Sequence, residues 1–307
     1  MKSLVGYTGF VGSNLHMQYK FDGKYNSKNI REAYGTNPEL LVYSGVRAEK
    51  FLANKNPEGD FELIEEAFEN INRIKPKKLV LISTIDVYKN PIKVDEDTLI
   101  DTIDLHPYGY NRYKLEEMVR ANFKDSLIIR LPGLYGKNIK KNFIYDLINV
   151  IPSMLTESKI NELVKREPAL IEYYIKHNNG FYKCRDLEEK EKYKLKECFR
   201  EIGFSAMNFT DSRGCFQFYN LKYLWKHIQL AIENNINTLN LATEPITISE
   251  LHEYITGKTF KNEVAEVIPN YNFESKYAKL IGGEKKYIFS KEFILEDIKN
   301  FVEEELR

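Results

Sequence analysis

The chain has 307 residues, 43% of them hydrophobic and 29% charged, which is the composition of a globular protein and excludes a disordered or fibrous chain. Its 45 basic residues balance its 45 acidic ones, which argues against the broad cationic face that binds nucleic acid or an anionic membrane. The three cysteines form no CxxC pair and no apolar run reaches the roughly 18 residues of a membrane span, so we expect a cytoplasmic protein with no metal site.

The first 131 residues alternate short apolar runs with amphipathic stretches, which is the pattern of a parallel sheet with crossover helices. One helix is predicted after Asn56 and Pro57, which can serve as N-cap and first helical residue, and another from about Tyr110 to Phe123. The pattern predicts an α/β protein with a Rossmann-like, doubly wound parallel sheet. Its strands are expected at 3–6, 24–26, 40–44, 78–84 and 126–131.

Residues 151–307 are expected to form mainly a smaller α/β domain for the substrate. This domain is discontinuous, because pieces near 205–245 return to the first domain. Residues 153–200 are densely charged and are interpreted as a helical insertion. Charges of mixed sign at i,i+4 spacing are usually a solvated helix face, and a lid or a partner surface is the alternative.

A glycine-rich turn, Gly6, Gly9 and Gly12, links the first strand to the first helix. Glycines let the backbone approach a pyrophosphate, and the free amides at a helix N-terminus attract its negative charge. The turn therefore predicts that residues 1–150 form an NAD(P)-binding Rossmann domain. The expected cofactor contacts in and beside the turn are Gly6, Thr8, Gly9, Phe10, Val11, Gly12, Tyr43, Ser44 and Gly45.

The loop after the second strand lacks the carboxylate that normally holds the ribose 2′-hydroxyl of NAD. It offers Ser27, Lys28 and Arg31 instead. A cationic, hydroxylated loop suits a 2′-phosphate better than a bare ribose, so we expect NADP rather than NAD. The alternative is a solvated loop whose cations contact nothing.

A Tyr-x-x-x-Lys pair, Tyr110 and Lys114, lies on the second predicted helix, shortly after the strand that ends at Thr84. Residues four apart share a helix face, so an ammonium group beside the phenol would favour the phenolate. Tyr110 is therefore interpreted as an acid and base for proton transfer. Tyr108 and Tyr113 are interpreted as packing or pocket wall, because neither has a lysine four residues later.

Four motifs together, by their order and spacing, resemble the extended short-chain dehydrogenase/reductase family of NAD(P)-dependent sugar-nucleotide epimerases, dehydratases and reductases. The resemblance implies that Thr84 and Tyr110 are catalytic and that Lys114 tunes Tyr110 and binds the nicotinamide ribose. It also implies a homodimer. The motifs are the glycine turn and residues 83–88, 107–114 and 130–136.

The implied function is C4 epimerisation or ketoreduction of a nucleotide-activated sugar. Dehydration is disfavoured, because Ile85 stands where dehydratases of the family carry a proton-donating aspartate. Asp86 and Arg213 are the expected substrate contacts, with a structural salt bridge as the alternative for Arg213. Two other functions stay open: a regulatory protein that binds NADP(H) without turnover, and a reductase of a small non-nucleotide carbonyl.

Overall fold

The computed structural model describes residues 1–177 and 180–306, and the chain divides into two compact units. Each unit is built from three separate segments of the chain. The first unit comprises Met1–Ile139, Cys215–Ile246 and Pro269–Ile298. The second comprises Lys140–Gly214, Thr247–Ile268 and the end of the chain from Lys299.

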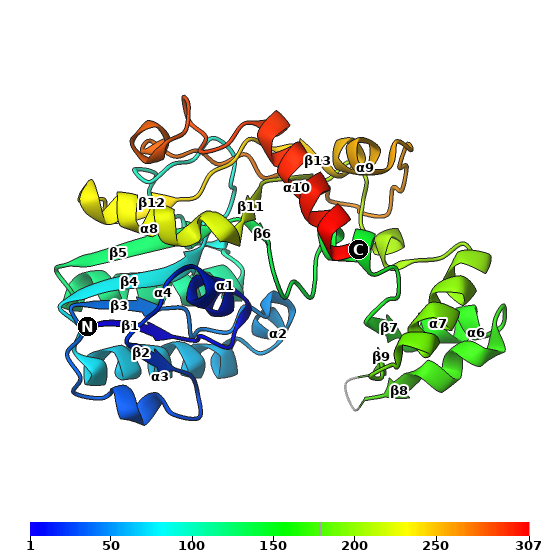
Figure 1. Ribbon diagram of the computed structural model, residues 1–307, viewed down its shortest axis with the longest axis horizontal. Coiled ribbons are helices and arrows are strands. Elements are labelled where there is room, and N and C mark those ends of the chain that lie inside the picture. The colour runs from blue at the N-terminus through cyan, green and yellow to red at the C-terminus, as the bar shows by residue number, and fades with distance from the viewer. Residues whose placement is uncertain (178–179, 307) are drawn as a thin grey trace. The chain divides into compact units, whose positions relative to one another are not determined.

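The first unit contains a six-stranded parallel sheet in the order β2-β1-β3-β4-β5-β12 (Figure 1). The strand order reverses between β1 and β3, which is the switch point where open α/β sheets bind ligands. The Rossmann-like, doubly wound sheet expected from the sequence is thus confirmed. The strands are β1 (Lys2–Val5), β2 (Gly23–Tyr25), β3 (Leu40–Tyr43), β4 (Lys78–Thr84), β5 (Ser126–Leu131) and β12 (Thr238–Asn240).

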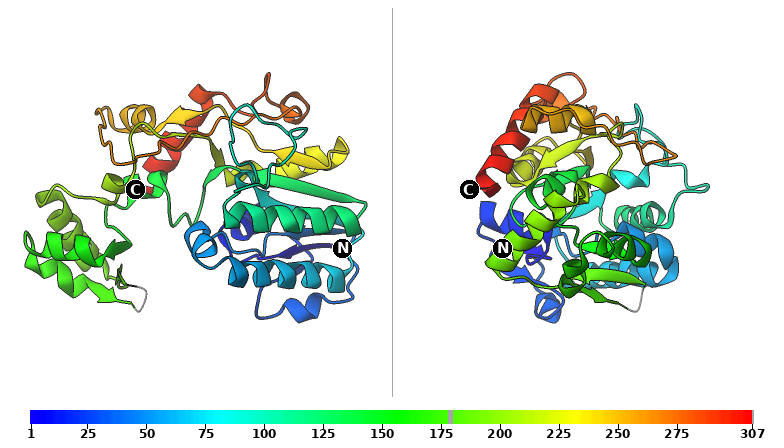
Figure 2. Two further views of the ribbon diagram at one scale, coloured as in Figure 1. Left: turned by 180° about the vertical axis from the view of Figure 1, so that it is seen from behind. Right: turned by 90° about the vertical axis from the view of Figure 1, so that its right-hand side faces the viewer.

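Helices cover both faces of this sheet, because its strands point apolar side chains towards both faces. One face packs against α1 (Phe10–Gln18) and α8 (Leu224–Glu233), where Leu15 and Ile228 are fully buried. The other packs against α3 (Pro57–Ile74) and α4 (Pro107–Asn122), which lie next to each other (Figure 2).

The expected cap of α3 is confirmed, since the Asn56 side chain accepts a hydrogen bond from the amide of Gly59. The start of α4 was predicted wrongly. This helix begins at Pro107, three residues before the predicted start at Tyr110, and His106 caps it by accepting a hydrogen bond from the amide of Gly109 at 3.0 Å. Histidine is not among the residues usually favoured at an N-cap, so this signal was not recognised in the sequence.

Shorter elements complete the first unit. Strands β10 and β11 are separated at Gln217, whose side-chain amide pairs with the backbone of Phe273 at 2.8 and 2.9 Å. The remaining elements are α2 (Lys50–Lys55), β6 (Gly133–Tyr135), β10 (Cys215–Phe216), β11 (Phe218–Asn220), β13 (Ile246–Thr247), the first half of α10 (Lys291–Leu306), and the 3-10 turns η1 (Ile30–Ala33), η2 (Ile85–Val87), η5 (Leu221–Tyr223) and η6 (Ala278–Ile281).

The second unit contradicts the prediction of a helical insertion over 153–200, because this stretch contains a three-stranded antiparallel sheet in the order β7-β9-β8. Its core gathers apolar side chains from the sheet and two helices, among them Leu155, Ile160 and Phe199. The expected solvated helix face is confirmed at the start of α7, where the charged residues 189–194 are mostly exposed. The elements are α5 (Phe143–Ile148), β7 (Met154–Thr156), α6 (Glu157–Val164), η3 (Pro168–Tyr173), β8 (Tyr174–Lys176), β9 (Phe181–Cys184), α7 (Glu189–Glu201), η4 (Ala206–Phe209) and α9 (Ile248–Thr256).

Within residues 1–177 and 180–306, no helix combines the length and the apolar character that crossing a membrane requires. The three cysteines are free thiols.

Candidate active site

The glycine turn has the geometry of a phosphate-binding turn. Gly6 has φ +88°, in the left-handed region, and a side chain there would clash with the backbone of Ser44 and Gly45. A side chain at Gly12 would run into the carbonyl oxygen of Gly6. Gly9 is the N-cap of α1, so the first amides of the helix lie directly after the turn. A pyrophosphate can therefore approach backbone amides that no side chain covers.

Of the other contacts expected beside the turn, all but Tyr43 lie in the turn, in the first turn of α1 or against Gly6. Thr8 is exposed, and Phe10 and Val11 are half-buried against the core of the α1 face. The backbone of Ser44 and Gly45 lies against Gly6, at the switch point between β1 and β3. Tyr43 differs, because its side chain is buried within the core of the α3 face and burial raises its pKa. Tyr43 is therefore a packing residue.

The loop after β2 is held in shape by its own asparagines. The side chain of Asn29 accepts from the amide of Asn26 at 2.8 Å, and that of Asn26 accepts from the amide of Lys28 at 2.9 Å. Ser27, Lys28 and Arg31 are all exposed. Their side chains are therefore open to a ligand at the end of β2, and the structure shows no carboxylate among residues 26–31.

The two members of the predicted Tyr-x-x-x-Lys pair lie on a partly exposed part of α4. Tyr110 is 37% exposed, and the Lys114 ammonium lies 5.4 Å from the centre of its ring. Lys114 forms a surface ion pair with Glu117 at 2.8 Å, which raises the pKa of the lysine. The pair itself is thus formed, but on the outer side of α4, and the assignment of these two residues as the catalytic tyrosine and lysine is not supported by their positions.

Tyr108 takes the position expected for Tyr110. It is only 8% exposed, and the Thr84 hydroxyl lies close enough to its phenol to lower the phenol's pKa. Residues 108 and 110 are about 200° apart around a helix, so only one of the two can face the sheet. Gly109 permits this approach, because a side chain there would collide with the carbonyl oxygen of Asp86 in η2.

A buried ion pair fixes this rotation of α4. Glu116 is fully buried and accepts hydrogen bonds from Arg130 of β5 at 2.6 and 3.1 Å and from Ser83 of β4 at 2.6 Å. Arg130 in turn donates to the hydroxyl of Tyr88 at 2.7 Å. Residues 108, 112 and 116 follow at four-residue intervals on one helix face, so anchoring Glu116 to the sheet turns Tyr108 inward as well.

Arg112 stands four residues after Tyr108, where the motif has lysine. Its guanidinium lies 4.0 Å from the centre of the Tyr108 ring, forms a buried ion pair with Asp60 of α3 and donates to the carbonyl oxygen of Arg47 at 2.6 Å. Asn111 donates to the same Asp60 carboxylate at 2.8 Å. This guanidinium is therefore committed to holding α4 against α3 and the loop before α2.

Burial raises the pKa of Tyr108, the opposite direction to the one that an acid/base tyrosine activated by a lysine would show. The positive charges of Arg112 and Lys50 and the nearby Thr84 hydroxyl act against the rise in the pKa, and the charge of Asp86 adds to it. Tyr108 is thus a protonated donor at neutral pH. This form suits protonation of an oxygen that gains negative charge.

Asp86, an expected substrate contact, belongs to a polar cluster beside Tyr108. Its carboxylate accepts from Lys50 of α2 at 2.9 Å and from the hydroxyl of Tyr271 at 3.1 Å. Its backbone amide donates to the side-chain oxygen of Thr84 at 3.1 Å. Lys50 and Tyr271 were missed in the sequence, because they come from segments far from Asp86 in the chain and carry no motif.

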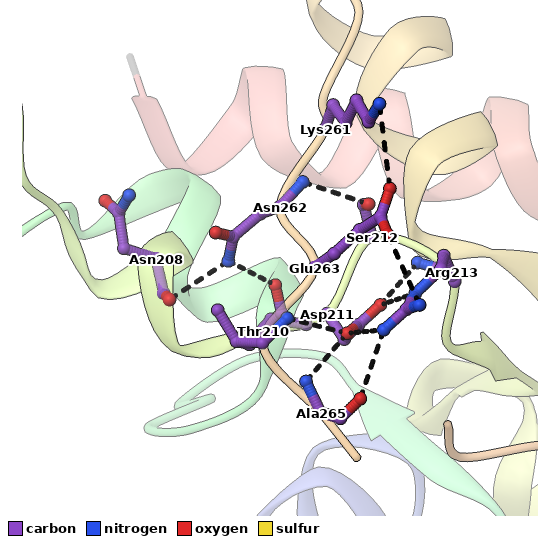
Figure 3. A network of polar contacts seen from close by, with 10 residues as sticks. Asn208, Thr210, Asp211, Ser212, Arg213, Lys261, Asn262, Glu263 and Ala265 are labelled. Atoms are coloured by element: carbon purple, nitrogen blue, oxygen red, sulfur yellow. Dashed lines mark hydrogen bonds and ion pairs between the residues drawn. The ribbon is translucent and has the colours of Figure 1, made fainter. Parts of the chain in front are cut away.

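Arg213, the other expected substrate contact, lies in the second unit (Figure 3). It donates to both carboxylate oxygens of Asp211 at 2.7 and 2.9 Å and to the carbonyl oxygen of Ala265 at 3.1 Å. The ion pair with Arg213, together with hydrogen bonds from the amides of Val264 and Ala265, lowers the pKa of Asp211. The network joins residues 208–213 to 261–265, which is the structural salt bridge given as the alternative for Arg213.

No family model and no curated protein matches the chain at the sequence level. Solved structures match it over almost the whole length. A dTDP-4-dehydrorhamnose reductase from Bacillus anthracis in complex with NADP is similar with a TM-score of 0.62 and 16% identity, covering 99% of this chain and 97% of that one.

Two epimerases are similar to the same degree. A UDP-glucose 4-epimerase from Thermotoga maritima with UDP-glucose gives a TM-score of 0.60 at 15% identity, over 99% and 98% of the two chains. A UDP-glucuronic acid 4-epimerase from Bacillus cereus with NAD gives 0.58 at 16% identity, over 100% of both. At these identities the likeness establishes the fold, and the fold implied by the resemblance to the extended short-chain dehydrogenase/reductases is confirmed.

Proposed function

We propose that the protein is an NAD(P)-dependent oxidoreductase acting at C4 of a nucleotide-activated sugar, by ketoreduction or epimerisation. The observation that carries the proposal is the pair of Thr84 and Tyr108 at the carboxyl end of β4. The β1–α1 glycine turn lies at the same end of the parallel sheet. Both reductases and 4-epimerases are among the structures of similar fold; the Bacillus anthracis reductase was solved with NADP and the Bacillus cereus epimerase with NAD.

The glycine turn is suited to hold the cofactor. Gly6, Gly9 and Gly12 leave room for a pyrophosphate, and Lys28 and Arg31 are exposed where an adenosine 2′-phosphate is expected. We therefore retain NADP(H) as the preferred cofactor over NAD. A bound nicotinamide supplies or accepts the hydride.

Tyr108 supplies the proton. Because its raised pKa keeps the phenol protonated at neutral pH, Tyr108 can donate to the sugar oxygen as the carbonyl is reduced. Thr84 can hydrogen-bond the same oxygen and hold it in place. The protonated resting form favours the ketoreductase over the epimerase, since epimerisation begins with removal of a hydroxyl proton.

A second candidate, a regulatory protein that binds NADP(H) without turnover, is favoured by one specific observation. The position four residues after Tyr108 holds Arg112 in place of lysine, and this guanidinium is engaged by Asp60 and the Arg47 carbonyl. A guanidinium and an ammonium are not interchangeable in such a position. The cofactor would then bind without an ammonium from α4 beside its ribose.

Turnover distinguishes the two candidates. The purified protein is incubated with NADPH or NADH and dTDP-4-dehydrorhamnose, following the nicotinamide absorbance, and with NAD and UDP-glucose, separating the C4 epimers. Mass spectrometry of copurifying small molecules widens the search for the sugar. We expect turnover in at least one assay and its loss in Tyr108→Phe. Calorimetric NADPH binding with no turnover on any nucleotide sugar would instead support the regulatory protein.

A homodimer and a cytoplasmic location also belong to this proposal. The free thiols of Cys184, Cys198 and Cys215 are compatible with a reducing compartment. Sedimentation at equilibrium tests the dimer.

A further inference from the structure

We propose that Lys50 is the positioning cation of the Thr84–Tyr108 pair and that it acts through Asp86. This inference rests on the proposed function, because it assigns Lys50 to the proton chemistry of that pair. In a Tyr-x-x-x-Lys motif the cation lies on the same helix as the tyrosine. Here the cation comes from α2 instead.

Three segments of the first unit meet at the Asp86 carboxylate. Lys50 opens α2, and its ammonium lies 2.9 Å from Asp86 and 3.4 Å from the hydroxyl of Tyr271. Tyr271 donates to the same carboxylate oxygen at 3.1 Å, and its ring stacks on Phe216 with centres 5.6 Å apart. Lys50, Asp86 and Tyr271 thus contact one another in pairs, and stacking on Phe216 holds the Tyr271 ring in place.

Asp86 is tied to both members of the proposed catalytic pair. Its amide donates to Thr84, and its carbonyl oxygen lies directly under Gly109, the residue after Tyr108. A displacement of Asp86 therefore moves the strand end that carries Thr84 and the first turn of α4. Lys50 and Tyr271 hold the side chain of Asp86 in place.

The other ionisable groups near Tyr108 cannot serve as the cation that positions the Thr84–Tyr108 pair. Arg112, on the same helix, is engaged by Asp60 and the carbonyl of Arg47, and Lys114 is paired with Glu117 on the outer side of α4. His106 faces Lys50 and Asp86, but burial and then the charge of Lys50 lower its pKa, so it is neutral at physiological pH.

Of the two described cations whose charges act on Tyr108, Arg112 and Lys50, Lys50 is the accessible one, with 42% of its side chain exposed. Its pKa is raised because the attraction of Asp86 and Tyr271 outweighs the effect of burial, so the amine stays charged. The charge offsets that of Asp86, which otherwise opposes ionisation of Tyr108. Removing the ammonium leaves an uncompensated carboxylate beside the phenol.

The test is an NMR titration of Tyr108 in protein labelled at the tyrosine ring carbon that bears the hydroxyl, with the signal assigned by Tyr108→Phe. The variants are Lys50→Met and the conservative Lys50→Arg. Lys55→Met, at the exposed end of α2, is the matched control. No cofactor or substrate is needed for this measurement.

We expect Lys50→Met to move the Tyr108 titration to higher pH by about one unit, the lower end of the range for a nearby charge because Lys50 is partly exposed. Turnover in the direction that requires the phenolate should fall about tenfold, with a matching shift of its pH profile. Lys50→Arg should restore both, and Lys55→Met should change neither. A Lys50→Met titration that coincides with that of the unmodified protein overturns the proposal.

The outcomes separate this inference from the proposed function. If the unmodified protein turns over no nucleotide sugar but Lys50→Met still shifts the titration, the proposed function fails and the action of Lys50 on Tyr108 stands. If turnover occurs and the titration does not respond to Lys50, the function stands and the role of Lys50 is refuted.

Discussion

Glu116 of α4 and Arg130 of β5 form an ion pair that is buried from solvent on both sides, with hydrogen bonds of 2.6 and 3.1 Å between them. The pair joins the helix that carries Tyr108 to the strand next to β4. Because burial is nearly complete, neither charge has water as an alternative partner. The rotation of α4, and with it the choice between Tyr108 and Tyr110, depends on this contact.

Breaking this pair should destabilise the protein strongly. We expect Glu116→Gln to lower the free energy of unfolding by about 3 kcal/mol, because it leaves the Arg130 guanidinium buried without a counter-charge. Denaturant unfolding measures the change. The matched control is Glu117→Gln, the next residue, whose ion pair with Lys114 is exposed and should contribute little. Equal losses in the two variants would contradict the assigned role of the buried pair.

The identity of the acid/base tyrosine can be tested with a pair of conservative substitutions on one helix. Tyr108→Phe should lower turnover by about a hundredfold or more, because it removes the proton donor while keeping the ring. Tyr110→Phe should leave turnover nearly unchanged, because that hydroxyl lies on the exposed side of α4. NADPH affinity, measured by calorimetry, should be similar in both. The reverse pattern of activity would restore Tyr110 as the catalytic residue.

The cofactor preference depends on the loop after β2. We expect NADPH to bind more tightly than NADH, and Lys28→Ala or Arg31→Ala to reduce NADPH affinity by about tenfold with little effect on NADH, because each change removes a charge-assisted contact with the 2′-phosphate. The control is Lys24→Ala, which changes an exposed lysine within β2 and should leave the difference between the NADPH and NADH affinities unchanged. Equal calorimetric affinities of the unmodified protein for NADPH and NADH would refute this assignment.

The stability of the second unit should depend on pH through Asp146 of α5. Burial raises the pKa of this carboxyl to about 7, well above its ordinary range, so the folded state holds a proton that the unfolded state releases. Its stabilising contribution is complete below the unfolded pKa and is lost as pH rises towards 7. Asp146→Asn removes this dependence.

Thermal and denaturant unfolding between pH 5 and pH 8 check this prediction. The stability of Asp146→Asn relative to the unmodified protein should increase by roughly 2 kcal/mol over that range. The exposed Asp186→Asn is the control in the same unit and should run parallel to the unmodified protein. A constant difference between Asp146→Asn and the unmodified protein would show that the carboxyl does not titrate in this range.

Much of the fold could be predicted from the sequence because its signals are local. The strand at Lys78–Thr84 contains the continuous apolar run Leu79–Ile82, and the start of α3 carries Asn56 and Pro57 in the expected cap positions. The strands of the second unit were missed, because β7 and β8 are three residues long and include charged or exposed side chains. β7 pairs with β9, a segment much further along the chain, so this pairing has no local signal.

The candidate site was predicted only in part for a related reason. Thr84 ends β4 and the glycine turn follows β1, and the ends of both strands are clear in the sequence. The Tyr110/Lys114 spacing satisfied the motif, but the structure turns Tyr108 inward instead, because the inward face of α4 depends on Glu116 meeting Arg130 from another strand. A carboxylate within a buried helix face, four residues after Arg112 and eight after Tyr108, was the available signal.

Because the first unit is discontinuous, its parallel sheet is completed only late in synthesis of the chain. Strand β5 ends at Leu131, but its outer neighbour β12 begins at Thr238, after the whole Lys140–Gly214 segment has been made. Until then the nascent sheet has an unpaired edge along β5, which is the kind of surface that recruits other chains. If synthesis pauses before residue 238, the nascent chain should therefore depend on chaperones. Once α8 and β12 have left the ribosome, β12 can pair with β5 and close that edge.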